Sequence, residues 1–324
     1  MRRKGIPPRS LLLVVALLLA LFPLVGADFY TELVTKVLIM AIFAMSLDLL
    51  VGATGLVSLG HAAFFGVAAY TVALVTPKTE AASLWLALPA AILAAALAAL
   101  LIGLFVLRTK GIYFIMVTLA FAQLVYFVFH DTKLGGGSDG VYVNFKPEPR
   151  IGGLMPFDLG NAVHFYYFAL AALVVVFLFL RRMLGSPFGR ALDGIRSNEH
   201  RMRSLGYQVY WYKLAAFVLA GAVAGVAGFL AACQYGFVNP ELLSWHHSAD
   251  ALLMVILGGM GSLSGAAIGA FAFVLLHELF SSVTKHWQLL MGGVILVAVM
   301  LLPGGLVTLP GRIRDLVFGR SEDE

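Results

Sequence analysis

The chain has 324 residues, of which 61% are hydrophobic and only 12% are charged, and its formal net charge is +5. Soluble domains carry about 25% charged residues, so one globular core cannot accommodate this much apolar sequence. The basic residues lie in short segments between apolar runs, which argues against a nucleic-acid-binding face. With Cys233 as its one cysteine, the chain can form neither an intrachain disulfide nor a cysteine-based metal site.

Apolar runs long enough to cross a hydrocarbon layer of roughly 30 Å recur along the whole chain. They predict an all-α integral membrane protein, a polytopic helical bundle of about ten transmembrane segments. The first run follows a basic head like that of a signal peptide, but we interpret it as a retained span because many spans follow. Glycines divide the stretch 248–280 into two spans. The predicted spans are 11–27, 33–51, 57–76, 84–107, 112–130, 163–180, 213–232, 248–257, 265–280 and 288–302.

The distribution of basic residues predicts the orientation of the chain. Ten spans put both termini on one side, which then holds sixteen of the 22 lysines and arginines and leaves six on the other. Basic residues accumulate in cytoplasmic segments. We therefore expect cytoplasmic tails at 1–10 and 303–324 around a transmembrane domain at 11–302, with an external loop at 131–162 and a cytoplasmic loop at 181–213.

The two long loops differ in their sequence patterns. The external loop is rich in glycine and proline, which predicts an irregular, exposed segment. In the cytoplasmic loop, Ser186 before Pro187 and Asn198 before Glu199 predict two short capped helices, and Gly206 suits the end of the second. Apolar residues at helical spacing in this loop indicate a surface that docks another protein.

Several motifs, in a common order, carry a family resemblance. They are AIFAMSLDLLVGATGLVSLGHAAFFGVAAYT (41–71), GIYFIMVTLAFAQLVYFVF (111–129), GGSDG (136–140), SPFGRALDGIRSNEHRMRSLGYQVYWYKLAAFVLAGAVAGVAGFLAA (186–232), VILGGMGSLSGAAIGA (255–270) and HWQLLMGGVILVAVMLLPGGL (286–306). In these segments the sequence resembles LivM-type permeases of branched-chain amino-acid ABC importers, within the LivH/LivM permease family. The resemblance covers nearly the whole chain after residue 30.

The resemblance implies a division of labour in a bacterial inner membrane. A periplasmic binding protein would deliver the substrate, this chain and a second, LivH-type permease would form the pathway, and two ATPase subunits of LivG and LivF type would bind ATP and Mg²⁺. This chain has no G-x-x-x-x-G-K-[ST] motif, so we expect it to bind no cofactor and not to be an enzyme. Branched-chain or other hydrophobic amino acids are the implied substrates, with urea, amides and aromatic acids as alternatives.

The resemblance also assigns residues to the contact with the ATPase subunits. In such importers a coupling helix lies in a groove of the ATPase, so that closure of the ATPase pair moves the attached spans. The family's coupling segment corresponds here to Gly189, Arg190, Ala191, Ile195, Arg196, Asn198, Glu199 and Gly206.

Glycines and polar residues inside the spans provide candidates for the substrate pathway. The glycine clusters at 52–60 and 258–265 permit either close helix packing or a broken backbone that lines the pathway. A mid-membrane amide such as that of Gln123 could meet substrate or bond a neighbouring helix. The pathway candidates are Ser58, His61, Gln123, Gly258, Gly259 and Gly261. In the external loop, Gly136, Gly137, Ser138 and Asp139 are candidates for an external gate or for docking the binding protein.

A secondary transporter is the main alternative from another class. Such a protein would use Asp48, His61, His277 and Glu278 as a proton or sodium relay. Asp48 lies near the cytoplasmic end of its span, so we expect its carboxylate to reach water or headgroups. We predict no metal site, because His277 and Glu278 do not continue into an H-E-x-x-H motif.

Overall fold

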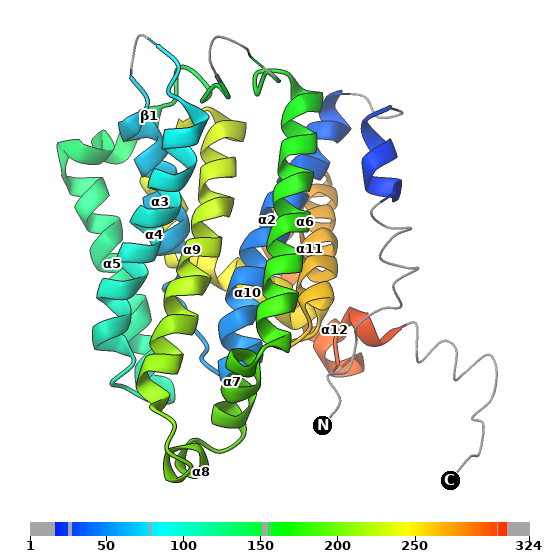
Figure 1. Ribbon diagram of the computed structural model, residues 1–324. Coiled ribbons are helices and arrows are strands. Elements are labelled where there is room, and N and C mark those ends of the chain that lie inside the picture. Colours follow the sequence, from blue (N-terminus) through cyan, green and yellow to red (C-terminus); the bar gives the residue numbers. More distant parts are fainter. Residues whose placement is uncertain are drawn as a thin grey trace.

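Six long apolar helices run roughly parallel to one another in the computed structural model, which describes residues 17–24, 28–77, 80–150, 155, 157–302 and 304–309 (Figure 1). Each has 20 to 27 residues and is apolar enough to cross a membrane. The prediction of a multi-pass helical membrane protein is therefore confirmed. The six are α2 (Asp28–Thr54), α4 (Leu84–Val106), α5 (Ile112–Asp131), α6 (Ala162–Gly185), α9 (Val209–Tyr235) and α11 (Leu263–Val283).

The described residues thus contain six helices long enough to span a membrane where the sequence predicts about ten spans, and shorter helices lie at three of the other predicted positions. They are α3 (His61–Val75), α10 (Trp245–Gly258) and α12 (Trp287–Leu301). Of the predicted first span, only residues 17–24 are described, as a helical turn that continues into η1 (Phe22–Leu24). The predicted tail at 1–10 lies outside the described residues, as does the tail at 303–324 apart from residues 304–309, which contain η5 (Leu306–Thr308).

Helix α2 forms the centre of the bundle, because it packs against α6, α9, α10 and α11 (Figure 1). Its most apolar window is completely buried within the chain, whereas only 17% of the corresponding window of α5 is buried. Helix α9 is the second buried helix and lies between α2 and the pair formed by α3 and α4. Hydropathy alone cannot separate these roles, because lipid and protein interior are both apolar.

Small residues allow α4 and α9 to approach closely. The buried alanines of α4 recur every fourth residue, at Ala87, Ala91, Ala95 and Ala99, and so form one stripe along the helix. A Cβ on Gly225 would lie only 2.8 Å from the Cβ of Ala95, so a larger side chain does not fit there. The G-x-x-x-G spacing in α9 therefore packs within this chain, against α4.

Two sets of short elements mark the opposite ends of the bundle. The strands β1 (Val141–Tyr142) and β2 (Phe237–Val238) pair antiparallel at the sheet end, near η2 (Lys133–Gly135), η3 (Gly137–Asp139) and η4 (Pro240–Leu243). At the other end, the α7–α8 end, lie α7 (Pro187–Ser197) and α8 (Glu199–Ser204) (Figure 1). Within the loop 131–162, which the sequence predicts to be irregular, the described residues form only the short elements η2, η3 and β1 and one isolated bridge between Glu148 and Ser83.

Candidate functional site

The predicted span 57–76 is not a continuous helix, because its first residues are not helical. Helix α2 ends at Thr54 and α3 begins only at His61, so residues 55–60 form a first break in the helical bundle. The side chain of His61 hydrogen-bonds Ser46. Ser46 lies eight residues before the end of α2, which corresponds to about 12 Å along the helix axis. The first break therefore runs back beside α2, and α3 starts inside the bundle.

Hydroxyl groups from distant elements satisfy the backbone groups that the first break frees. The N–H of Leu59 donates to Oγ1 of Thr118 in α5 at 3.3 Å, and the N–H of Ala62 donates to Oγ of Ser248 in α10 at 2.7 Å. Within the break, the N–H of Gly60 donates to Oγ of Ser58 at 3.2 Å. Freed backbone groups are tolerated in a membrane protein only when they are satisfied in this way.

His61 is completely buried and has one specific partner. Its Nε2 lies 2.8 Å from Oγ of Ser46, and the hydroxyl of Ser46 in turn donates to the carbonyl of Phe43. Because that proton is already used, Ser46 accepts from His61, which places the imidazole proton on Nε2. The Nδ1 atom has no partner among the described residues. Ser58 is also fully buried, so neither of these pathway candidates faces an open cavity.

A second break, residues 259–262, separates α10 from α11, as the glycine cluster predicts. The backbone of Gly259 has a φ of +117° and that of Gly261 a φ of +82°, a region that only glycine adopts without strain. Oγ of Ser262 then caps α11 by accepting from the N–H of Gly265 at 3.2 Å. Gly258 ends α10 at the point where the two helices meet, since a Cβ on Gly265 would lie 2.9 Å from its carbonyl oxygen.

The second break contacts the end of α2, next to the first break. A Cβ on Gly52 would lie 2.6 Å from Cα of Gly261, so the two backbones are in direct contact. Oδ1 of Asp48 accepts a hydrogen bond from the N–H of Gly261 at 2.7 Å. Asp48 is only 3% exposed, which shows that the expectation of a carboxylate in water or headgroups is wrong. The carboxylate instead stabilises the turn between α10 and α11.

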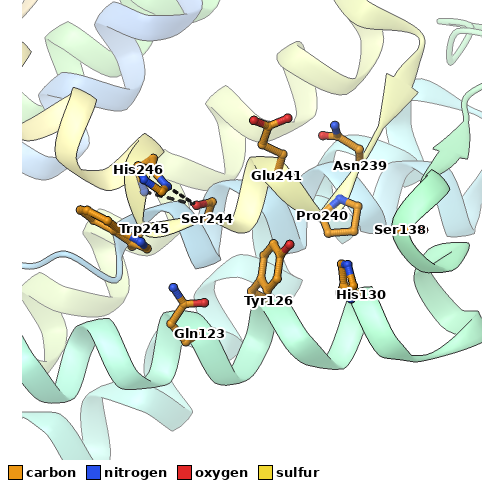
Figure 2. Close-up of a pocket in the computed structure, with 10 residues that line it drawn as sticks. All are labelled: Gln123, Tyr126, His130, Ser138, Asn239, Pro240, Glu241, Ser244, Trp245 and His246. Atoms are coloured by element: carbon orange, nitrogen blue, oxygen red, sulfur yellow. Dashed lines mark hydrogen bonds between the residues drawn. The ribbon is translucent and has the colours of Figure 1, made fainter. Parts of the chain in front are cut away.

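A cavity of about 450 Å³ opens at the sheet end, between α5 and the segment that leads into α10 (Figure 2). Gln123, Tyr126 and His130 line one face of α5, as their spacing of three and four residues requires. Glu241 lies on the opposite wall, and the hydroxyl of Ser244 hydrogen-bonds the imidazole of His246 at 2.9 Å. The remaining lining residues are Ser138, Asn239, Pro240 and Trp245.

This cavity brings together candidates from two separate predictions. Gln123 was a pathway candidate inside a span, and Ser138 was a gate candidate in the external loop. Ser138 and Asp139 lie on η3, between Gly136 and Gly140, and both side chains are exposed. Gly136 and Gly137 have positive φ values of 73° and 67°, which allow the tight turns on either side. No sequence motif identified the segment 239–246 that forms the second wall.

At the α7–α8 end, the two short helices have the predicted caps. Oγ of Ser186 accepts from the N–H of Gly189, with Pro187 at the first helical position of α7. Oδ1 of Asn198 accepts from the N–H of Arg201 at 2.9 Å and caps α8. Gly206 follows α8 with a φ of +88°. Helix α7 is amphipathic, because Gly189, Ala191, Leu192 and Ile195 are buried while Arg190 is exposed.

Glu199 is held by cations from three different segments. Its carboxylate accepts from Nζ of Lys213 in α9 at 2.8 Å and from Arg203 one turn later, and it lies 3.7 Å from Nζ of Lys110. Partial burial acts to raise the pKa of Glu199, but the hydrogen bond from Lys213 and the three positive charges outweigh it, so the pKa is lowered. This cluster joins α8 to α9 and to the loop between α4 and α5.

Arg196, another charged coupling candidate, also makes a contact within the chain although it is partly exposed. Its Nη1 donates a hydrogen bond to the carbonyl oxygen of Gly52, at the end of α2. Of the three charged candidates of this segment, Arg196 and Glu199 thus make contacts within the chain, whereas Arg190 is exposed. Among the described residues, no three His, Cys, Asp or Glu side chains lie close enough together to hold a metal ion.

Comparison with known proteins agrees with this architecture. Residues 29–300 match the family described as "Branched-chain amino acid transport system / permease component". The chain is 33% identical to the high-affinity branched-chain amino acid transport system permease protein LivM of Escherichia coli K12, over 98% of this chain and 79% of that protein. It is also 33% identical to the LivM protein of Salmonella typhimurium, over 90% of this chain and 73% of that protein.

A more distant similarity covers part of the chain. The autoinducer 2 import system permease protein LsrC of Photorhabdus laumondii is 29% identical over 37% of this chain and 38% of its own length. No solved structure matches the chain. The family match and the similarity to the LivM proteins both extend over most of the chain, from the central helix α2 to α12. The chain therefore belongs to the family of branched-chain amino acid transport permeases.

Proposed function

We propose that this chain is a permease subunit of an ATP-driven importer that moves branched-chain or other hydrophobic amino acids into the cytoplasm. The main support is its 33% identity to LivM of Escherichia coli along 98% of its length. An inner-membrane location and a subunit without its own ATPase activity follow from the same proposal. ATP and Mg²⁺ would then bind to two partner ATPases.

The proposed topology has ten spans with both termini in the cytoplasm. Six long helices, the segment around 17–24, α3 with the first break, α10 and α12 would provide these spans. We assign the α7–α8 end to the cytoplasm, because the loop 181–213 carries a concentration of basic residues. The sheet end then faces the periplasm, where a substrate-binding protein would dock.

The cavity at the sheet end supports a substrate entrance at this position. A volume of about 450 Å³ is in the range of small-molecule sites, and the lining combines an acid, two imidazoles and two amides with apolar rings. Beside it, α5 exposes a run of large apolar side chains, including Leu124 and Phe127. We assign this apolar face of α5 to the second permease, so that the two subunits would enclose the pathway between them.

The contacts of three of the four candidate relay residues support an importer over an ion-coupled transporter. Asp48 hydrogen-bonds a backbone amide and His61 hydrogen-bonds Ser46, so each has a local structural role. The ring of His277 packs against that of Trp287, with centroids 4.3 Å apart. A proton relay needs groups that exchange protons with one another, and these contacts serve packing and turn formation instead.

The test is reconstitution of the chain in liposomes with the second permease, both ATPases and the periplasmic binding protein. We expect uptake of radiolabelled leucine to require the binding protein and internal ATP together. Uptake that follows a proton or sodium gradient without ATP would contradict the proposal. ATP-dependent uptake of urea, an amide or an aromatic acid in place of leucine would retain the importer and change only the substrate.

A further inference from the structure

One side chain of the coupling segment reaches both breaks of the bundle. Arg196, in the last turn of α7, donates from Nη1 to the carbonyl oxygen of Gly52. A Cβ on Gly55, in the first break, would lie 3.4 Å from Cγ of this arginine. A Cβ on Gly261, in the second break, would lie 3.5 Å from its Nη1. Arg196 therefore contacts both departures from helical structure at once.

The acceptor of this hydrogen bond is a carbonyl group that the helix itself does not satisfy. Gly52 lies in the last turn of α2, where carbonyl groups lack the usual N–H partner four residues on. The N–H of Leu56 donates instead to the carbonyl of Leu50 at 3.2 Å. A guanidinium group is well suited to this place, because cations are stabilised at the negative end of a helix dipole.

Asp48 holds the same junction from the side of α2. Its Oδ1 accepts from the N–H of Gly261 at 2.7 Å and would lie 2.7 Å from a Cβ on Gly52. The backbone contact between Gly52 and Gly261 is thus flanked by an acid from α2 and a base from α7. The acid is buried and fixed by its helix, whereas the base belongs to the short helix that projects at the α7–α8 end (Figure 1).

We infer that Arg196 is a positioning residue that transmits displacement of α7 to the junction of the two breaks. The inference rests on the proposed function, in which partner ATPases move α7. When α7 shifts, Arg196 moves with it and displaces the end of α2 together with the turn between α10 and α11. Asp48 keeps that turn attached to α2, so both breaks move as one unit. Leu192 and Ile195 are buried, and they hold α7 on the bundle when the arginine is replaced.

The experiment uses the full complex of both permeases and both ATPases, with a reporter placed at the second break. Met260 lies between Gly259 and Gly261 and is 56% exposed, while the natural cysteine, Cys233, is fully buried. An environment-sensitive fluorophore on Met260→Cys therefore reports on this turn. We expect ATP to change its emission in the otherwise unaltered complex, with or without leucine.

Arg196→Gln should reduce this ATP-dependent change at least tenfold, while the ATPases still copurify and hydrolyse ATP within twofold of the unaltered rate. Arg196→Lys keeps a positive donor and should restore part of the change. Arg182→Gln, an exposed arginine in the last turn of α6, is the matched control and should leave it intact. The fluorescence signal needs no substrate, so its outcome is independent of whether leucine is the transported solute.

Two outcomes would overturn the inference. A fluorescence change of normal size in Arg196→Gln would show that α7 moves the second break without the arginine. Loss of the ATPases from the purified Arg196→Gln complex would show that the arginine is a docking residue. A thermal unfolding temperature equal to that of the unaltered complex excludes general destabilisation as the cause of a reduced signal.

Discussion

Replacing Gly52 by alanine adds one methyl group at the contact between the two breaks. The new Cβ would lie 2.6 Å from Cα and 2.9 Å from the backbone nitrogen of Gly261, and 2.7 Å from Oδ1 of Asp48. Two of these atoms belong to the backbone and the third to a buried side chain, so the contact cannot be relieved by rotating a flexible group. Overpacking of this kind costs about 1 to 3 kcal/mol.

The same methyl group also disturbs the hydrogen bond between Asp48 and the N–H of Gly261. A hydrogen bond to a charged group contributes about 1.5 to 3 kcal/mol, and its partial loss adds to the steric term. Alanine is the better helix former by about 0.5 to 1 kcal/mol, which offsets part of the cost. We expect Gly52→Ala to destabilise the chain by about 2 kcal/mol, or roughly 5 °C in unfolding temperature.

Cys233 provides the assay for this prediction. It is the one cysteine of the chain and is fully buried, so a thiol-reactive fluorophore reacts only as the bundle unfolds. Gly292→Ala is the control, because a Cβ on Gly292 in α12 meets no atom within 4 Å. We expect the control to unfold at or slightly above the unaltered temperature. Equal unfolding temperatures for the two variants would refute the direct backbone contact at Gly52.

Three further predictions concern the other parts of the bundle. The pKa of Glu199 is lowered from its ordinary value of 4.5, so the carboxylate stabilises the fold above that pH and this contribution is lost as the pH falls below it. The unfolding temperature, followed by tryptophan fluorescence, should therefore fall less steeply between pH 6 and 3.5 for Glu199→Gln than for the unaltered chain. Parallel pH dependences of the two would contradict the ion cluster. Glu241→Gln should raise the leucine concentration at half-maximal uptake about tenfold, the effect of losing ~1.4 kcal/mol of binding, and an unchanged value would remove Glu241 from the entrance. Gly225→Val should lower the unfolding temperature more than Gly292→Ala does, because the Cβ at position 225 would approach the Cβ of Ala95 at 2.8 Å. Equal unfolding temperatures of these two variants would contradict the packing of α4 on α9.

Local patterns in the sequence were sufficient where structure depends on neighbouring residues. Ser186, Pro187 and Asn198 predicted the starts of α7 and α8, because a cap needs only a side-chain acceptor and the next few amides. The glycine cluster predicted the second break for a similar reason. Four glycines within eight residues cannot maintain a membrane helix without a specific packing partner.

Contacts between distant residues could not be predicted in the same way. Asp48 accepts a hydrogen bond from a residue that is 213 positions away in the sequence. From its place near the end of a predicted span we expected the carboxylate to lie in water, whereas the fold provides a backbone amide as its partner. The strands β1 and β2 have two residues each, which is too few for an alternating pattern. Four helices separate these two strands in the sequence. The wall of the cavity around Glu241 likewise becomes a site only when α5 is placed opposite to it.

The two breaks also explain why polar residues occur where they do in an apolar chain. A regular helix satisfies its own backbone, so a membrane span needs no polar side chains, and each interruption creates amides and carbonyls that need partners. Thr118 and Ser248 meet this need at the first break, Asp48 meets it at the second, and Arg196 meets it at the end of α2. Three of these four lie within the bundle, whereas Arg196 comes from a helix outside it. A junction that is completed by a side chain of α7 moves when α7 moves, and this distinguishes the end of α2 from the backbone groups held by Thr118 and Ser248, whose helices belong to the bundle itself.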